Sequence, residues 1–314
     1  MRKLIILIPL LFVFIGGYAQ QEAQYTQFMY NKLSLNPAYA GSSETSCFSC
    51  IHRSQWVGFE GAPSSQVVNF HAPLFKQRVG LGASIAHDQI GPINSFTASL
   101  MYAYRMKIGK GNLALGLRGT LRNYRINWSE TQSTHSGDEE IPTENSSRIL
   151  PNFGFGVYYH TEKFYLGIST PSLLKGDLSY TYLNNSDAFG TEKTHLYLMT
   201  GYVFKVNNNI KFKPAALVKY TANSPLDLDL NATFIFLDKL WFGVSYRLGG
   251  DANRGIGESI DLLAQYQISK KLRIGVAYDF TLSKLKDYNS GTFEIQMEYC
   301  LNPKDKRLTN PRFF

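Results

Sequence analysis

After its first fifteen residues the chain contains no apolar run long enough to cross a bilayer as a helix, because such a helix needs about 20 consecutive apolar residues. Charged residues are scarce, at 18% of 314, and no Pro-rich or Ser-rich linker divides the chain. Lysine and arginine do not cluster among aromatic residues, which argues against nucleic-acid binding despite a formal net charge of +8. Any residence in a membrane must therefore come from the β-strands of a single domain.

Motifs of catalysis are also missing. The six histidines are dispersed, no Gly-x-Ser-x-Gly elbow is present, and the Gly-x-Gly pairs lack the third glycine and the helix of a dinucleotide site. We expect no enzymatic activity and no cofactor, with a serine–histidine site assembled from separate strands as the alternative. His135, with Asp138, Glu139 and Glu140, could bind a hard cation, but these residues match no motif spacing, so a solvated acidic loop is favoured.

What the chain does contain is strict alternation. In residues 271–282 every even position is apolar, whereas the odd positions include Arg273, Gly275, Ala277 and Asp279. Successive side chains of a strand point to opposite faces, so this strand has one apolar face and one mixed face. Similar strands recur at 163–169 and 239–246. The many aromatic residues (20 Tyr and 21 Phe) suit an apolar face that meets lipid.

The alternation predicts roughly fourteen strands between residues 45 and 301, joined by connections of two lengths. The short connections fall at 108–111, 161–162, 207–209, 238 and 269–270; the long ones fall at 129–149, 171–192, 249–256 and 283–290. This rhythm predicts an all-β fold, an antiparallel transmembrane β-barrel of the outer membrane, rather than a soluble β-sandwich. The inward face would carry Arg105, Arg118, Arg122, Lys211, Asp227, Asp229 and Glu298.

The two ends of the chain differ from the barrel region. Residues 1–19 resemble a cleaved signal peptide, with a basic start, a short apolar stretch and small residues before the cleavage site after Ala19. We expect an N-terminal segment at 20–44, the barrel at 45–301 and a periplasmic tail at 302–314. The long loops would face outside, and both termini would lie in the periplasm of a Gram-negative cell.

The segment 20–44 is aromatic but does not alternate. We predict that Tyr25, Phe28, Tyr30 and Tyr39 pack at or inside the periplasmic mouth of the barrel as a plug, because free aromatic rings would gain from burial. Inward glycines at that end either provide barrel curvature or seat such a plug. These glycines are Gly82, Gly116, Gly167, Gly243 and Gly275.

The three cysteines allow one pairing across the barrel seam. Cys47 and Cys50 are three residues apart on a predicted strand and so face opposite sides, which disfavours a bond between them. If the barrel closes, its first and last strands are neighbours, and Cys47 and Cys300 lie at the same end. A disulfide between these two is one hypothesis, and three unpaired cysteines is the other.

A set of motifs lies in the N-terminal part of the chain and at its end. These are residues 27–31 and Leu35, then Asn36, Pro37, Ala38, Tyr39, Gly41, Arg53, Gln55, Trp56, Gly61, Ala62, Pro63, Asp88 and Gly91, and the terminal residues 310–314. With these motifs the chain resembles the PorP/SprF family of the type IX secretion system of the Bacteroidota, over nearly the whole of its mature length. The resemblance implies an outer-membrane barrel that receives the C-terminal domain of a secreted adhesin-like protein and anchors it at the cell surface, as in gliding motility. Its expected partners are that cargo, other type IX secretion components and outer-membrane lipid.

Two expectations follow for function and stability. Cargo would bind mainly to the long connections 129–149 and 171–192, and a channel for small solutes is the alternative function. Arg or Lys placed at outward Val276 should cost about 2–4 kcal/mol of stability, and we expect the same change at inward Ala277 to be milder.

Overall fold

The computed structural model describes residues 24–43, 45–130, 145–176, 192–222, 224–249 and 257–301. The predicted signal peptide, the predicted tail at 302–314 and the acidic loop around His135 lie outside these ranges. No helix within them is long and apolar enough to cross a membrane.

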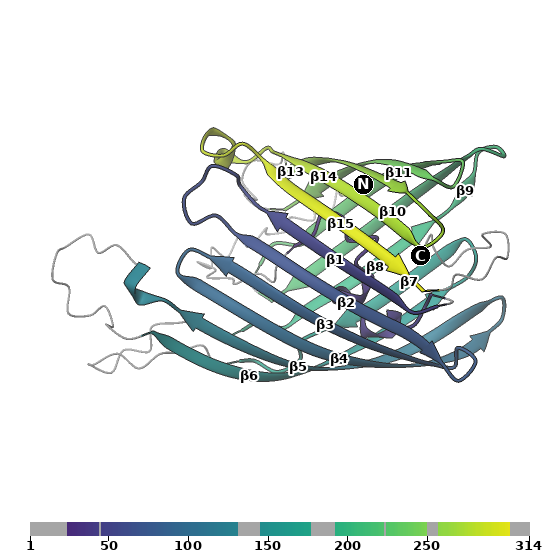
Figure 1. Ribbon diagram of the computed structural model, residues 1–314, viewed down its shortest axis with the longest axis horizontal. Coiled ribbons are helices and arrows are strands. Elements are labelled where there is room, and N and C mark those ends of the chain that lie inside the picture. The colour runs from purple at the N-terminus through teal and green to yellow at the C-terminus, as the bar shows by residue number, and fades with distance from the viewer. Residues whose placement is uncertain are drawn as a thin grey trace, which may run out of the picture.

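The described residues form one antiparallel sheet that closes on itself (Figure 1). Its strands are β1 (Cys47–Ser54), β2 (Ser64–Leu74), β3 (Val79–Ile90), β4 (Ile93–Ile108), β5 (Gly111–Ile126), β6 (Ser146–His160), β7 (Phe164–Thr170), β8 (His195–Tyr202), β9 (Phe204–Lys205), β10 (Ile210–Thr221), β11 (Asp227–Phe236), β12 (Leu240–Leu248), β13 (Ser259–Gln267), β14 (Leu272–Thr281) and β15 (Thr292–Cys300). The short helices are α1 (Lys32–Leu35), η1 (Pro37–Tyr39), η2 (Trp128–Glu130) and η3 (Lys284–Asp287).

The barrel has fourteen strands, because β8 and β9 are one strand with a gap. Both pair with β10, and the register continues unbroken from Gly201 opposite Ala215 to Phe204 opposite Phe212. The two positions where the pairing with β10 is interrupted, Tyr202 and Val203, lie opposite Pro214 and Lys213, and Pro214 has no N–H to donate to the ladder. Closure comes from β1, which pairs with β15 along its whole length. The prediction of a closed, roughly fourteen-stranded antiparallel barrel is confirmed.

The faces of the strands follow the predicted alternation. On β14, Arg273, Ala277 and Asp279 are buried in the interior, whereas Val276 and Phe280 are exposed on the outer surface. The same pattern recurs around the barrel and leaves a broad apolar outer surface. A membrane barrel needs this arrangement, because lipid solvates apolar side chains and the ladder satisfies the backbone.

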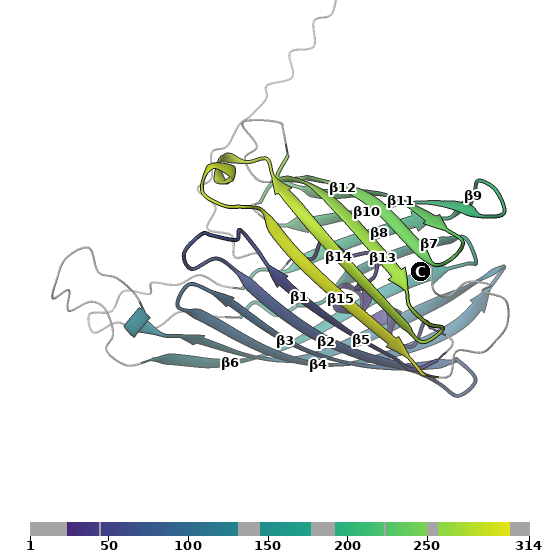
Figure 2. The same cartoon turned by 45° about the horizontal axis from the view of Figure 1, so that its top comes forward.

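Connections of different length lie at opposite ends of the barrel. One end, called the short-turn end here, carries the turns at 75–78, 109–110, 161–163, 206–209, 237–239 and 268–271. The other, the long-loop end, carries η2, η3, the connections 55–63 and 282–291 and one short turn, 91–92; the strands on either side of 127–145 and 171–194 also end there. Strand β1 starts and β15 finishes at the short-turn end. Figure 2 shows β1 to β6 on one wall, β10 to β14 on the other, and the purple N-terminal segment between them.

Candidate functional site

Residues 24–43, called the lumenal segment here, lie inside the barrel rather than beside it. This segment contains irregular turns, α1 and η1. Thr26, Gln27, Met29, Ala38 and Ala40 have essentially no solvent exposure. A single hydrophobic cluster joins Phe28, Met29 and Tyr30 to inward residues of nine strands, β5 to β8 and β10 to β14. The interior of this barrel is therefore a packed core built around the lumenal segment.

A buried group of charged residues binds the lumenal segment near the long-loop end. Arg53 on β1, Asp279 on β14 and Glu294 on β15 form a buried group that we call the carboxylate clamp; Arg53 contacts Asp279 at 2.9 Å and Glu294 at 3.2 Å. The backbone N–H groups of Thr26 and Gln27 donate to the two oxygens of Glu294 at 2.9 and 3.0 Å. The Thr26 hydroxyl donates to Asp279 at 2.7 Å and accepts from Arg53 at 2.6 Å. Each charge in the clamp is thereby paired, as burial requires.

A second ionic group holds the first described residue. Lys219 near the end of β10 contacts Asp227 at 3.2 Å and Asp229 at 2.8 Å, and Arg247 contacts Asp229 at 2.9 Å. The side chain of Gln24 donates to Asp227 at 2.9 Å and accepts from Lys219 at 3.0 Å. The start of the lumenal segment is therefore fixed to the long-loop ends of β10 and β11.

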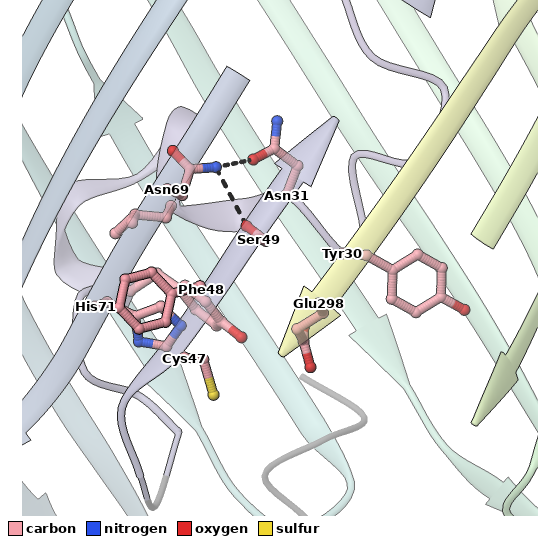
Figure 3. Close-up of a pocket in the computed structure, with 10 residues that line it drawn as sticks. Tyr30, Asn31, Cys47, Phe48, Ser49, Asn69, His71 and Glu298 are labelled. Carbon is pink, nitrogen blue, oxygen red and sulfur yellow. Dashed lines mark hydrogen bonds between the residues drawn. The ribbon is translucent and has the colours of Figure 1, made fainter. Parts of the chain in front are cut away.

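Amide groups fix the middle of the segment. Gln265 on β13 donates to the side chain of Gln27 at 2.9 Å. On the opposite wall, Asn69 of β2 donates to Asn31 at 2.8 Å. Figure 3 shows the Asn69 amide directed at both Asn31 and Ser49, beside a small pocket. Among the described residues no group of His, Cys, Asp or Glu is placed to hold a metal ion.

Cations and aromatic rings pack together toward the short-turn end. The ammonium group of Lys32 lies 4.7 Å from the ring centre of Tyr165 and 5.2 Å from that of Tyr39. Lys213 lies 4.8 Å from the ring centre of Tyr30. Stacked cations of this kind gain attraction from the ring quadrupole.

The motif at 36–41 makes a tight turn against the barrel wall. The Asn36 side chain accepts from the backbone N–H of Ala38 at 2.9 Å and so caps η1, with Pro37 at its first position. Its amide also donates to the carbonyl of Val157 on β6 at 3.0 Å. Gly41 has a φ of +63° and lies against Ala72, where an added Cβ would meet the Ala72 carbonyl oxygen at 2.7 Å.

The inward glycines leave room for this turn. A Cβ on Gly82 would meet the Ala40 side chain at 3.2 Å, one on Gly116 would strike the backbone at Pro37 and Ala38, and one on Gly167 would meet Asn36 at 2.9 Å. Gly275 lies in the same way against Gln27. Of the five glycines singled out in the sequence, only Gly243 faces barrel side chains instead. These close approaches favour the plug-seat interpretation of the other four.

The four aromatic residues predicted as a plug are spread along the interior. Tyr30, 8% exposed, lies in the short-turn half among Lys213, Arg273 and Trp241, and the ring of Tyr39 lies 5.5 Å from that of Tyr158. Phe28 belongs to the main core cluster. Tyr25 packs against Ile51 and Val67, deeper than the mouth at the short-turn end. The segment thus fills the length of the lumen, where the sequence led us to expect a plug at one mouth.

The remaining charged residues expected inside are inward, and two of them bind the segment. Arg105 donates to the carbonyl of Ala40, and Arg118 donates to that of Ser34 at 2.9 Å. Arg122 pairs with Glu192, and Arg273 pairs with Glu298 at 2.7 Å. Lys211 pairs with Asp238 at the short-turn end, at 2.6 Å.

The seam between β1 and β15 carries the cysteine pair. Cys47 lies directly opposite Cys300, with 4.1 Å between their Cα atoms, and the two form a disulfide. Cys50 is a free thiol on the outward side of β1. The seam is therefore joined covalently at the short-turn end and by the Arg53–Glu294 pair, also directly opposite, toward the long-loop end.

The other motif residues build an ordered edge at the long-loop end. We call residues 55–63 the rim ledge. Its Val57 exchanges backbone hydrogen bonds with residues 290 and 291 of the β14–β15 connection, and its Gly61 accepts one from Gly91. The backbone of Gln55 donates to Pro63, and Ala62 donates to Phe59. Trp56 adopts a φ of +49°, which is uncommon for a bulky residue and is imposed by these contacts. Asp88 lies on the inward face of β3 nearby.

Sequence reasoning missed the partners of the inward charges. Thr26, Lys32 and Lys219 were not singled out, although all three are buried and contact other elements. The sequence feature that could have indicated them is the presence of polar residues in a short segment that shows no alternation. That signal marks a segment that needs polar partners but does not say which ones.

Comparisons with known proteins agree with this geometry. The model of the family described as "Type IX secretion system membrane protein PorP/SprF" matches residues 17–299. No curated protein matches the sequence.

Solved structures similar to this chain are outer-membrane barrels. The crystal structure of the Acinetobacter baumannii outer membrane protein Omp33 is 9% identical, with a TM-score of 0.50 and coverage of 83% of this chain and 100% of that chain. The CymD monoaromatic hydrocarbon channel is 12% identical, with a TM-score of 0.51 and coverage of 87% and 93%. The deltaS2 mutant of the TodX monoaromatic hydrocarbon channel is 10% identical, with a TM-score of 0.51 and coverage of 86% and 94%. At these identities the likeness shows the fold alone.

Proposed function

The chain belongs to the PorP/SprF family of type IX secretion system membrane proteins, and on this basis we propose that it docks a secreted adhesin-like protein at the cell surface. In this proposal the C-terminal domain of the cargo binds at the long-loop end, which faces outside in barrels of this kind. The protein acts as an anchor, and other secretion components deliver the cargo to it.

The observation that carries this proposal is the occupied lumen. Residues 24–43 form hydrogen bonds with the barrel wall along their length, from Gln24 with Asp227 to Gly41 with His71. The same residues share a hydrophobic cluster with the wall. Removing the segment would leave the buried charges of the carboxylate clamp without Thr26 and would empty the core, which is costly. A barrel filled in this way is better suited to holding a partner at its rim than to passing solutes.

The rim ledge supplies an ordered apolar surface for such a partner. Val57 and Phe59 are 45% and 43% exposed, and Tyr288 of the neighbouring connection is 69% exposed. Hydrogen bonds to residues 290–291 and to Gly91 hold the ledge in place. Binding of a partner would therefore cost little conformational entropy in the ledge. The long connections at 129–149 and 171–192 are the other proposed contacts.

A charge placed on the ledge tests docking. Phe59→Asp should release cargo into the medium, because a carboxylate would be desolvated against an apolar partner. Phe75→Asp is the matched control, since Phe75 is equally apolar and 76% exposed but lies at the short-turn end. Cargo on washed cells and in the medium is measured by immunoblot, with barrel abundance checked in parallel. Equal cargo retention by both variants and the unchanged protein would count against docking at the ledge.

Conductance separates the dock from the alternative, a channel for small solutes. The unchanged protein should give little current in a planar bilayer, and deletion of residues 36–41 should open the lumen or destabilise the barrel. High steady conductance of the unchanged protein would favour the channel. A deletion variant that folds, retains cargo and gives no new conductance would show that the segment is not a plug.

A further inference from the structure

The lumenal segment has a direction. Its first described residue, Gln24, is bonded to Asp227, the first residue of β11, and to Lys219, near the last residue of β10. Strand β10 runs from the short turn at 206–209 to the long-loop end. Gln24 therefore lies at the long-loop end of the interior.

The other end of the segment lies at the opposite opening. The N–H of Gly41 donates to His71 at 3.2 Å, and the carbonyl of Ala40 accepts from Arg105. Both partners are close to the short turns that end β2 and β4. The next residues lead directly into β1, where the N–H of Leu301 donates to the carbonyl of Ser46 at 2.8 Å. The chain thus crosses the whole lumen before it forms its first strand.

The residues before Gln24 are too few to return to the short-turn end. If the leader is cleaved after Ala19, as the sequence predicts, residues 20–23 extend at most about 14 Å. Between Lys219 and Ile210, β10 spans about 30 Å along the strand, which is about 21 Å along the axis at a strand tilt of about 45°. The route back is also filled by the segment itself.

We propose that this barrel is threaded, so that the mature N-terminus is displayed at the cell surface while the end of β15 faces the periplasm. This replaces the expectation that both termini are periplasmic. The surface on which a partner lands would then include the first residues of the mature chain, near the mouth that carries the rim ledge.

Threading also constrains assembly. The barrel is closed by a full ladder and a disulfide at the β1–β15 seam. A segment that leaves at the end opposite its own strand must be enclosed as the seam closes, or pass lengthwise through the finished lumen. A folded domain fused before Gln20 is too large for either route. A single-residue change near Gln20 is compatible with both.

Cysteine labelling of intact cells tests the topology. In a Cys50→Ser background the disulfide leaves no free thiol, and Gln21→Cys introduces one ahead of the segment. Lys286→Cys in η3 is the control for the long-loop end, and Lys271→Cys in the 268–271 turn is the control for the short-turn end. We expect a membrane-impermeant maleimide to label Gln21→Cys and Lys286→Cys to the same extent on intact cells. Lys271→Cys should be labelled only after the outer membrane is opened.

The opposite results are distinct. If Gln21→Cys is protected on intact cells together with Lys271→Cys while Lys286→Cys is labelled, threading is wrong. Labelling of Gln21→Cys in neither condition would also reject surface display. Heat-modifiable migration in a gel confirms folding of each variant, and Glu22→Cys gives a second position if Gln21→Cys fails that check. No readout involves cargo, so the result is independent of the docking proposal.

Discussion

The two ends of the β1–β15 seam are closed by different chemistry. At the short-turn end the closure is covalent, through Cys47 and Cys300, and the lumenal segment nearby rests on glycines by backbone contact. Toward the long-loop end the closure is ionic, through Arg53 and Glu294, and the segment shares those charges through Thr26. The short-turn end therefore depends on close backbone packing and a disulfide, and the long-loop end on one buried arginine shared by two carboxylates. Different substitutions should therefore weaken the two ends of the seam, and by different amounts.

The largest effect should come from breaking the carboxylate clamp. Arg53→Met should destabilise the barrel by about 3–5 kcal/mol, because it leaves Asp279 and Glu294 buried without their cation. Lys211→Met is the control, since its pair with Asp238 is partly exposed and should contribute at most about 1 kcal/mol. Guanidinium unfolding in detergent measures both. Similar losses from the two variants would mean that the clamp does not hold the long-loop end.

The covalent end should come next. Reduction, or the double change Cys47→Ala with Cys300→Ala, should cost about 2–4 kcal/mol through the constraint lost from the unfolded chain. Cys50→Ala should leave the unfolding midpoint unchanged. Thiol counting in the unfolded, unreduced protein should find one reactive thiol, and reduction should raise the count to three. Three thiols before reduction would contradict the bond.

Overpacking of a glycine contact should have a smaller effect. Gly116→Ala places a methyl group against the backbone of Pro37 and Ala38, which cannot turn away, and should cost about 1–3 kcal/mol. Gly119→Ala on the same strand meets nothing within 4 Å and should be neutral or stabilising by about 0.5 kcal/mol. A Gly116→Ala barrel as stable as the Gly119→Ala barrel would show that the turn at 36–41 is not seated there.

The filled lumen also changes the expectation for Ala277. From the sequence, a basic residue at this inward position should be milder than one at Val276. In the structure Ala277 is 2% exposed and belongs to the core cluster with Phe28 and Met29. An arginine there would have to displace the lumenal segment, so we no longer expect the inward change to be the milder one.

Local pattern was sufficient for the barrel. Period-two alternation and the rhythm of short and long connections predicted the closed antiparallel fold, the inward face of β14 and the neighbouring of Cys47 and Cys300. These features follow from chemistry repeated within each strand, because a strand that faces lipid on one side must alternate wherever it occurs. The N-terminal motif likewise pointed to the family that the comparison shows.

Only the tertiary structure decided how the interior is filled. Thr26 meets Asp279 across 253 positions, and Gln24 meets Asp227 across 203. Such partners are set by register, strand tilt and closure, which bring together residues from strands that are far apart in the sequence. The direction in which residues 24–43 run through the lumen has the same origin. A segment without alternation carries no local signal of which opening it leaves by, and its path is set by the charges and glycines that the closed barrel presents to it.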